Sequence, residues 1–152
     1  FGIRYFFMAE HYFFMAERGV DHLKRIDVSN NKIGDQGLEH LQGLTGLRSL
    51  NLVGTQVSDN GLKYIEKMSN LSMLALGGTQ ISGNGLAHLK GLANLNHLFL
   101  HSTDVDDEGL THLRELNNLR TLFLPGTKVT DAGGKRLQQA LPNCRIASNP
   151  RK

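Results

Sequence analysis

The chain has 152 residues, a formal net charge of +3 at neutral pH and 39% hydrophobic residues. This length suits one domain. The small net charge, with Lys and Arg scattered rather than gathered in a stripe, argues against nucleic acid as a partner. The single cysteine, Cys144, excludes an internal disulfide, and we interpret it as a small apolar residue rather than a reactive thiol. The sequence does not indicate a cellular compartment.

The N-terminal segment, residues 1–19, contains YFFMAE twice at a spacing of seven residues. On a helical wheel the Tyr, Met and Ala of both copies share one apolar face. We expect an amphipathic helix that caps the next segment, or the remnant of a longer chain. Phe7 and Phe14 fall among the polar positions, where they could contact a partner or a missing upstream repeat. Charges interrupt every apolar run, so no membrane insertion is predicted, and no signal-peptide layout is visible.

Residues 20–147 repeat with a period of 24, and residues 148–152 form a polar tail. Three of the columns that obey this period are Ile26, Leu50, Leu74, Leu98, Leu122; Ile33, Val57, Ile81, Val105, Val129; and Gly37, Gly61, Gly85, Gly109, Gly133. Repeats of about 20 to 29 residues with regular leucines are typical of a solenoid, and about five repeats exceed the roughly three that stability requires.

Each repeat predicts a short strand followed by a short helix. Leu50 and Leu52 alternate with Ser49 and Asn51, which indicates a strand buried on one face. Apolar residues then recur at every third position over 62–68, as one face of a helix requires. Neighbouring strands lie about 4.8 Å apart whereas helices need roughly 10 Å, so the stack must curve with parallel strands on its concave side.

Helix starts also follow the period. The column that precedes each helix mostly offers N-cap residues and contains Gly34, Ser58, Ser82, Asp106 and Thr130. The next column is mostly acidic, with Asp35, Asp59, Asp107 and Asp131, and we expect these carboxylates near the positive helix ends. Gly83 interrupts the acidic column, and Pro142 with a slip of one residue ends the pattern.

These features, with GTQVSDNGL and GTKVTDAGG as the repeated core, resemble the leucine-rich-repeat family. The pattern G-T-x-[IV]-[ST]-D-x-G-L looks like the bacterial ribonuclease-inhibitor-like type. It is also similar to the cysteine-containing repeats of F-box proteins, which place Cys where this chain has Thr. The resemblance implies an α/β fold, a right-handed solenoid with a parallel sheet on the concave face and short helices on the convex face. Asn31 and Gly134 depart from the pattern, because they replace the Thr and a core Leu.

One polar column is interpreted as a structural ladder that faces into the turns. It consists of Asn31, Thr55, Thr79, Thr103 and Thr127. Buried hydroxyl and amide groups must find hydrogen bonds, and we expect them to bond backbone groups of neighbouring coils.

No catalytic motif is present, and we predict no enzyme, no cofactor and no metal site. The sequence lacks H-E-x-x-H, G-x-S-x-G and a P-loop, and TDVDDEG lacks the order of a calcium loop. His97 and His101 share a strand face but lie roughly 13 Å apart, too far to hold one metal ion. His40, His88 and His112 form one column on the convex face, where we expect solvated side chains rather than a zinc site.

The concave surface remains as the candidate binding site. Its N-terminal strands offer the secondary positions Arg25, Asp27, Asn51 and Met73. The candidate patch itself consists of His97, Phe99, His101, Asp104, Thr121 and Phe123. Phe99 and Phe123 occupy equivalent positions on adjacent strands, so we expect their rings to lie side by side and exposed, roughly 5 Å apart at their bases. An exposed aromatic pair with a polar rim resembles an interface hot spot, although the curved sheet or a C-terminal segment could partly cover it.

The leading hypothesis is a non-enzymatic module that binds an unknown protein or peptide on this face, which is also what the family resemblance implies. The alternative is a structural or adaptor segment of a longer repeat protein, with an F-box-like adaptor as one version although no F-box is visible. An enzyme would need converging polar groups, for which His97, His101 and Asp104 are the nearest candidates. Upstream coding sequence would separate the first two hypotheses.

Overall fold

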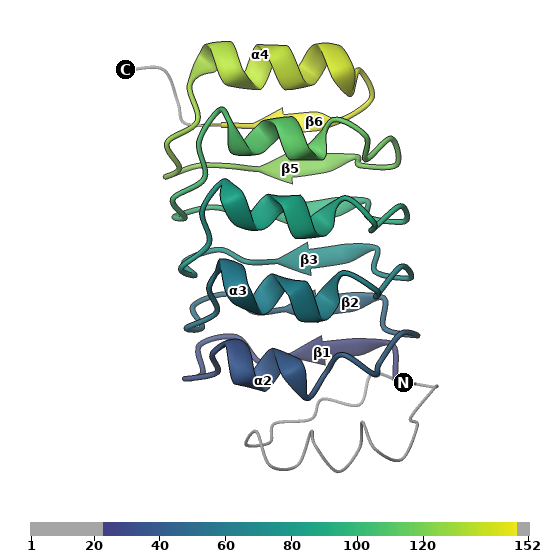
Figure 1. Cartoon of the computed structure of the whole chain (residues 1–152). Coiled ribbons are helices and arrows are strands. Elements are labelled where there is room, and N and C mark those ends of the chain that lie inside the picture. The colour runs from purple at the N-terminus through teal and green to yellow at the C-terminus, as the bar shows by residue number, and fades with distance from the viewer. Residues whose placement is uncertain (1–22, 149–152) are drawn as a thin grey trace.

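The computed structural model describes residues 23–148, which form one regular stack (Figure 1). The segment predicted to be an amphipathic N-terminal helix, residues 1–19, and the tail residues 149–152 lie outside the described residues. The strands form a single parallel sheet in chain order: β1 (Arg25–Asp27), β2 (Ser49–Asn51), β3 (Met73–Ala75), β4 (His97–Phe99), β5 (Thr121–Phe123) and β6 (Arg145–Ala147).

The register of the sheet follows the sequence period. Leu50 lies opposite Leu74, and Leu74 lies opposite Leu98, so equivalent residues of successive repeats are neighbours in space. The sheet continues into a sixth strand that the sequence did not predict. Ile146 of β6 pairs with Leu122 of β5 at the same offset, so the slip near Pro142 is absorbed before the strand begins. The end of the apolar pattern therefore does not end the sheet.

Short helical segments lie on the side of the stack opposite the strands (Figure 1). They are α2 (Asp35–Glu39), α3 (Asp59–Leu62), η1 (Lys63–Ile65), η2 (Asn84–Leu89), η3 (Gly109–Leu113) and α4 (Asp131–Ala140). The segments η1, η2 and η3 are 3-10 helices, which have three residues per turn. The apolar spacing of three fits this geometry, because Leu86 and Leu89 of η2 are both fully buried.

The core runs as one continuous column between the sheet and the helices. Leu50, Leu74, Leu98 and Leu122 have no exposed surface, and each shares the core with leucines from the helical side. Full burial of such a side chain contributes on the order of 1.5–3 kcal/mol. Along each strand, the alternation read from the sequence therefore places the central residue in the core and leaves the residues next to it on the outer face of the sheet.

The turn after each of the first five strands contains one residue with a left-handed backbone. These residues also follow the period: Asn30, Gly54, Gly78, Ser102 and Gly126, with φ between 55° and 76°. Glycine and asparagine adopt this conformation at little cost, which explains their use in four of the five positions. The turns direct each chain segment from the sheet toward the helical side, so the whole is an α/β solenoid.

Candidate binding surface

The side chains that point away from the core form a surface that we call the open sheet face. The strand register arranges them in two rows across the sheet. The first row contains Arg25, Ser49, Met73, His97, Thr121 and Arg145. The second row contains Asp27, Asn51, Ala75, Phe99, Phe123 and Ala147. Residues of one row that belong to adjacent strands are about 4.8 Å apart at the backbone.

Phe99, His101 and Phe123 form an aromatic cluster on this face. The ring centroids of Phe99 and Phe123 are 6.3 Å apart with planes tilted by 59°. The rings of His101 and Phe123 meet edge to face, with their centroids 5.7 Å apart and their planes at an angle of 66°. Both separations lie in the range where aromatic pairs attract one another. The two phenylalanines lie side by side as expected, but only Phe123 is exposed, at 37%, whereas Phe99 is half-buried.

Gly77 explains why the His101 ring can lie close to the neighbouring coil. A β-carbon at Gly77 would overlap the imidazole ring, so any larger residue would displace His101. The Nδ1 atom of His101 is buried and has no hydrogen-bond partner among the described residues. The ring is therefore held by contact with Gly77 and Phe123 rather than by hydrogen bonds.

The N-terminal end of the open sheet face is polar, and its groups bond one another. Asn51 Nδ2 donates to Asp27 Oδ2 at 3.1 Å. Asp27 Oδ1 accepts from the backbone nitrogen and the hydroxyl of Ser29 at 3.0 Å and 2.7 Å. Arg25 is exposed, whereas Met73 is half-buried beside the aromatic end. The secondary candidates thus lie on the same face, but Asp27 and Asn51 already serve as partners for each other.

Asp104 lies away from the two rows. It follows the turn after β4, where it forms an isolated parallel bridge with Ser82. Its carboxylate pairs with Lys128 Nζ at 2.8 Å, and both side chains are about two-thirds exposed, at 69% and 66%. The hydrogen bond and the charge of Asp104 raise the pKa of Lys128 above 10.5. The structure thus brings together Phe99, His101 and Phe123, with His97 and Thr121 in the adjoining row, but sets Asp104 apart.

The structural ladder differs from its expected form. Each threonine hydroxyl donates to the carbonyl three residues earlier in its own coil, as Thr79 does to Leu76 at 2.5 Å and Thr103 to Leu100 at 2.6 Å. Thr55 and Thr127 do the same, and Asn31 donates to Val28 and Ser29. The expectation of bonds to neighbouring coils was wrong, because the turn brings the carbonyl of the same coil closer.

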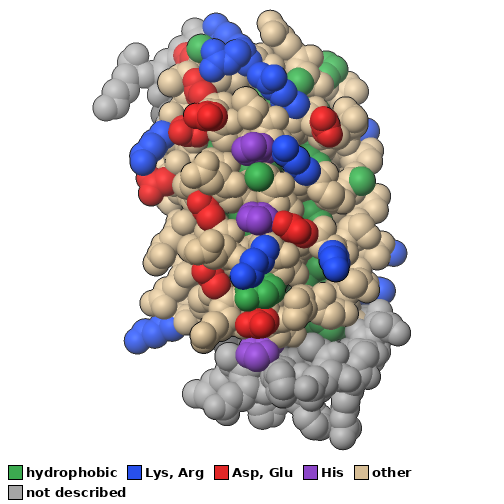
Figure 2. Space-filling model, viewed as in Figure 1, with side chains coloured by type: hydrophobic (Ala, Val, Ile, Leu, Met, Phe, Trp, Pro, Cys, Tyr) green, Lys and Arg blue, Asp and Glu red, His purple; other side chains and the backbone are tan. Residues whose placement is uncertain are grey.

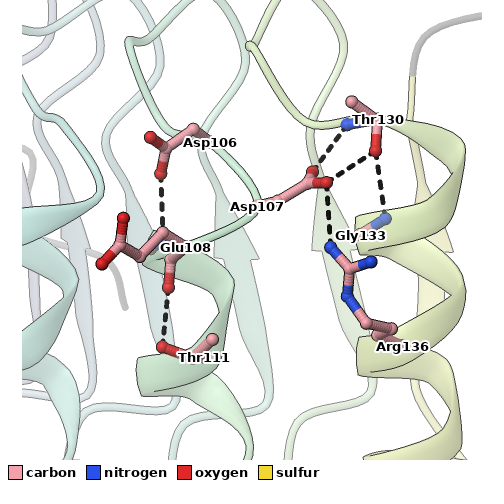
Figure 3. Close-up of polar contacts among 8 residues, drawn as sticks. Asp106, Asp107, Glu108, Thr111, Thr130, Gly133 and Arg136 are labelled. Atoms are coloured by element: carbon pink, nitrogen blue, oxygen red, sulfur yellow. Dashed lines mark hydrogen bonds and ion pairs between the residues drawn. The ribbon is translucent and has the colours of Figure 1, made fainter.

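Two other polar columns join the coils, and the sequence analysis missed both roles. The aspartates after the helix-start positions accept hydrogen bonds from the Ser or Thr of the following coil, as Asp107 does from Thr130 (Figure 3). Asn70, Asn94 and Asn118 donate to backbone carbonyls of the preceding coil at 2.8–3.0 Å. In the sequence, the only sign of this role in joining coils is that the aspartates and the asparagines each recur at multiples of 24 residues.

The helix-start column acts less often as a cap than expected. Ser58 makes no capping bond to α3, and its hydroxyl donates to Asp35 of the preceding coil. Thr130 both donates to Asp107 and accepts from Gly133 at the start of α4. Asp106 accepts from Gly109 at 2.9 Å. The prediction of N-cap side chains therefore holds for Thr130 and fails for Ser58, whereas Asp106 bonds Gly109 although the N-cap of η3 is Glu108.

The charged side chains of the helical side are spread over its surface. Figure 2 shows its Lys, Arg, Asp and Glu side chains dispersed, with histidines along the middle. His88 pairs with Glu66 of the preceding coil. Within residues 23–148 no group of three or more His, Cys, Asp or Glu could hold a metal. Cys144 is buried, and burial raises the pKa of its thiol to about 11, although the charge of Arg120 opposes this shift.

The chain is similar to a family model of leucine-rich repeats and to several solved structures. The model of the Leucine Rich repeat family matches residues 22–41 and 44–65. Internalin C2 of Listeria monocytogenes str. 4b F2365 is 29% identical, with a TM-score of 0.70 over 82% of this chain and 50% of its own. Internalin inlF of the same strain is 28% identical, with a TM-score of 0.76 over 98% of this chain and 39% of its own. This chain thus spans half or less of these relatives.

A third structure shares the fold alone. It is the leucine-rich-repeat ectodomain of the plant membrane receptor kinase GASSHO1/SCHENGEN3 from Arabidopsis thaliana, solved in complex with CASPARIAN STRIP INTEGRITY FACTOR 2. Its identity is 16% and its TM-score 0.62, over 88% of this chain and 16% of its own. No curated protein sequence matches significantly. No helix within residues 23–148 has the length and apolar character to cross a membrane.

Proposed function

We propose that this leucine-rich-repeat chain is a non-enzymatic recognition module whose open sheet face binds a protein or a peptide at the aromatic cluster. The observation that carries the proposal is the exposure of Phe123. Among residues 23–148 it is the one large hydrophobic side chain that is exposed, although dozens of others are buried. Its burial against a partner is favourable at roughly 25 cal/mol per Å² of apolar surface. That the repeats are of the ribonuclease-inhibitor-like type is still a prediction.

The packing around Phe123 supports the same role. Phe99 and His101 both pack against the Phe123 ring, and the absence of a side chain at Gly77 leaves the space that the His101 ring occupies. A side chain held in this way loses little conformational freedom when a partner binds, which lowers the cost of association. Aromatic side chains near the centre of an interface commonly carry much of the binding energy.

The similarity to other repeat proteins adds a general argument. Leucine-rich-repeat domains generally mediate protein–protein interactions, and the matched family model and the two internalins support that class of function. The chain spans only part of those internalins, so the particular partner and the concave-face mode of binding are parts of our proposal.

The test is affinity capture from the native source with a charge-matched control. Phe99→Asp with Phe123→Asp places two carboxylates in the cluster. Ala87→Asp with Ala132→Asp adds the same charge at exposed positions of the helical side. Circular dichroism must show that both variants are folded. A partner held by the wild type and the control but lost by the cluster variant supports the proposal. A partner captured equally by all three, or no partner at all, would overturn it in favour of the structural alternative.

A further inference from the structure

Around the aromatic cluster, the outward residues of the open sheet face include basic side chains but no acidic ones. The outward residues of β3 to β6 include no carboxylate: Met73, Ala75, His97, Phe99, Thr121, Phe123, Arg145 and Ala147. At the other end of the sheet β1 carries Arg25 together with Asp27, and that carboxylate is bonded by Asn51 and Ser29. Acidic groups are therefore absent from the part of the face where the exposed ring lies.

Two basic side chains flank this part of the face in one row. His97 and Arg145 lie on either side of Thr121, one strand away in each direction. Strand spacing sets their backbones roughly 10 Å apart. Phe123 lies two residues along β5 from Thr121, so the row of the ring and the row of the basic groups are about 7 Å apart.

Neither basic side chain is neutralised within the described residues. His97 and Arg145 are both exposed, and neither forms an ion pair or a side-chain hydrogen bond there. Two carboxylates that follow β4 are occupied elsewhere. Asp104 pairs with Lys128, and Asp107 pairs with Arg136 at 3.1 Å on the helical side (Figure 3). The chain thus leaves these two groups available for a carboxylate from outside.

We propose that the occupant of the open sheet face is an extended peptide segment with an Asp or Glu within two residues of a large apolar side chain. The apolar side chain packs on Phe123, and the carboxylate is bound by Arg145 or His97. A guanidinium presents paired N–H groups that match a carboxylate, and one residue of extended chain spans about 3.3 Å, so two residues cover the distance between the rows. This inference rests on the proposed function and names the chemistry of its partner.

The test is selection of a random linear peptide library displayed on phage against the immobilised chain. We expect the selected peptides to be enriched in Asp or Glu within two positions of an aromatic or aliphatic residue. Arg145→Glu should weaken the binding of such a peptide by about fivefold, since exposed ion pairs contribute up to about 1 kcal/mol. Arg114→Glu, an equal charge change on the helical side, should leave the binding unchanged. Selection against Arg145→Glu should instead enrich Lys or Arg.

The outcomes separate this inference from the proposed function. Peptides that lose binding with Phe123→Asp but contain no acidic preference would overturn the inference and keep the proposed function. Peptides insensitive to Phe123→Asp would overturn both. The absence of any selected peptide would overturn the inference, and the affinity capture would then decide the proposed function. A single-stranded oligonucleotide that competes with the selected peptides at equal affinity would also overturn the inference, because it would show that negative charge alone is recognised.

Discussion

Asp107 binds Thr130 of the next coil through both carboxylate oxygens. Oδ1 accepts from the backbone nitrogen at 2.7 Å, and Oδ2 accepts from the hydroxyl at 2.6 Å (Figure 3). Asp35 binds Ser58 in the same way, and so does Asp59 with Ser82. Each carboxylate thereby joins two coils outside the six-stranded sheet, where the isolated bridges between Ser58 and Gln80 and between Ser82 and Asp104 also pair coils. This column therefore helps to set the stacking distance on the helical side.

Replacing Asp107 by Ala should destabilise the fold by about 1–3 kcal/mol, because hydrogen bonds to charged groups are stronger than neutral ones and Thr130 loses its acceptor. Asp104→Ala removes an exposed ion pair that water screens, and it should cost less than Asp107→Ala. Urea denaturation followed by circular dichroism measures both. Equal losses in the two variants would show that the bond between Asp107 and Thr130 contributes no more than a surface ion pair.

The same contact should depend on pH. Partial burial alone would raise the pKa of Asp107, but hydrogen bonds from Thr130 and the charge of Arg136 outweigh it and hold the pKa below 3.8. A lowered pKa in the folded state stabilises the protein above pH 3.8, and the contribution is lost as pH falls through the folded value. The stability difference between wild type and Asp107→Ala should therefore shrink between pH 5 and the acid limit of folding. A constant difference would contradict this account.

Restoring the interrupted acidic column by Gly83→Asp should destabilise the protein rather than stabilise it. A β-carbon at Gly83 would lie 2.9 Å from the Cα of Gly109 and 2.6 Å from the carboxylate of Asp106. The new carboxylate would also meet Asp106, which has no hydrogen to donate, where the other coils offer Ser or Thr. Overpacking of this kind typically costs about 1–3 kcal/mol.

Gly83→Ala separates the two causes, since it adds the β-carbon without the charge. Asp106→Ser in the Gly83→Asp background should recover part of the loss, because it supplies the missing hydroxyl donor. Thermal unfolding compares the four proteins. An increase in melting temperature for Gly83→Asp alone would show that the contact between Gly83 and Gly109 does not limit the position.

The asparagine column, Asn70, Asn94 and Asn118, should stabilise the stacking of each coil on the preceding one. Asn94 Nδ2 donates to the Ser69 carbonyl of the preceding coil at 2.8 Å. Asn94→Asp keeps the shape but removes the donor and sets a carboxylate against a carbonyl, so we expect a loss of about 1–2 kcal/mol. Asn117→Asp, at an exposed position whose side chain makes no such bond, is the matched control. Comparable stabilities of the two variants would contradict a role for the column.

Cys144 should react slowly with thiol reagents in the folded protein. Its side chain is only 3% exposed, and burial raises its pKa from 9.0 to about 11, so little thiolate exists at pH 8. Because the folded thiol keeps its proton to higher pH than the unfolded thiol, this contribution to stability is complete below pH 9 and is lost as pH rises toward 11. Labelling kinetics at pH 8 with and without denaturant test the first point. Equal rates would show that Cys144 is accessible.

The apolar part of the fold could be predicted because burial depends on residue type and period alone. Leu50, Leu74 and Leu98 recur every 24 residues, and each is fully buried in the predicted strand. The sixth strand was missed since its apolar pattern is weaker: Ile146 is the residue that packs on the core, and Ser148 stands where earlier repeats have Leu.

Polar contacts were harder to predict because their partners are not equivalent residues. Asp59 bonds a residue 23 positions later, and Asn94 bonds one 25 positions earlier, so alignment at 24 does not pair the atoms that meet. The threonine hydroxyls instead donate to a carbonyl three residues earlier in their own coil, and the period does not indicate this partner. Phe99 and Phe123 occupy the same column of the repeat, so the period alone could not show that Phe123 is exposed and Phe99 half-buried.

The central claim is that Phe123 contacts a partner, and site-specific photo-crosslinking tests it most directly. A benzophenone amino acid replaces Phe123 in one protein and exposed Lys90 of the helical side in another, and each is irradiated with the selected peptide or the captured partner. We expect a covalent product from position 123 and none from position 90, with the attachment point located by mass spectrometry. Crosslinking from position 90 alone, or equally from both positions, would contradict recognition through the open sheet face.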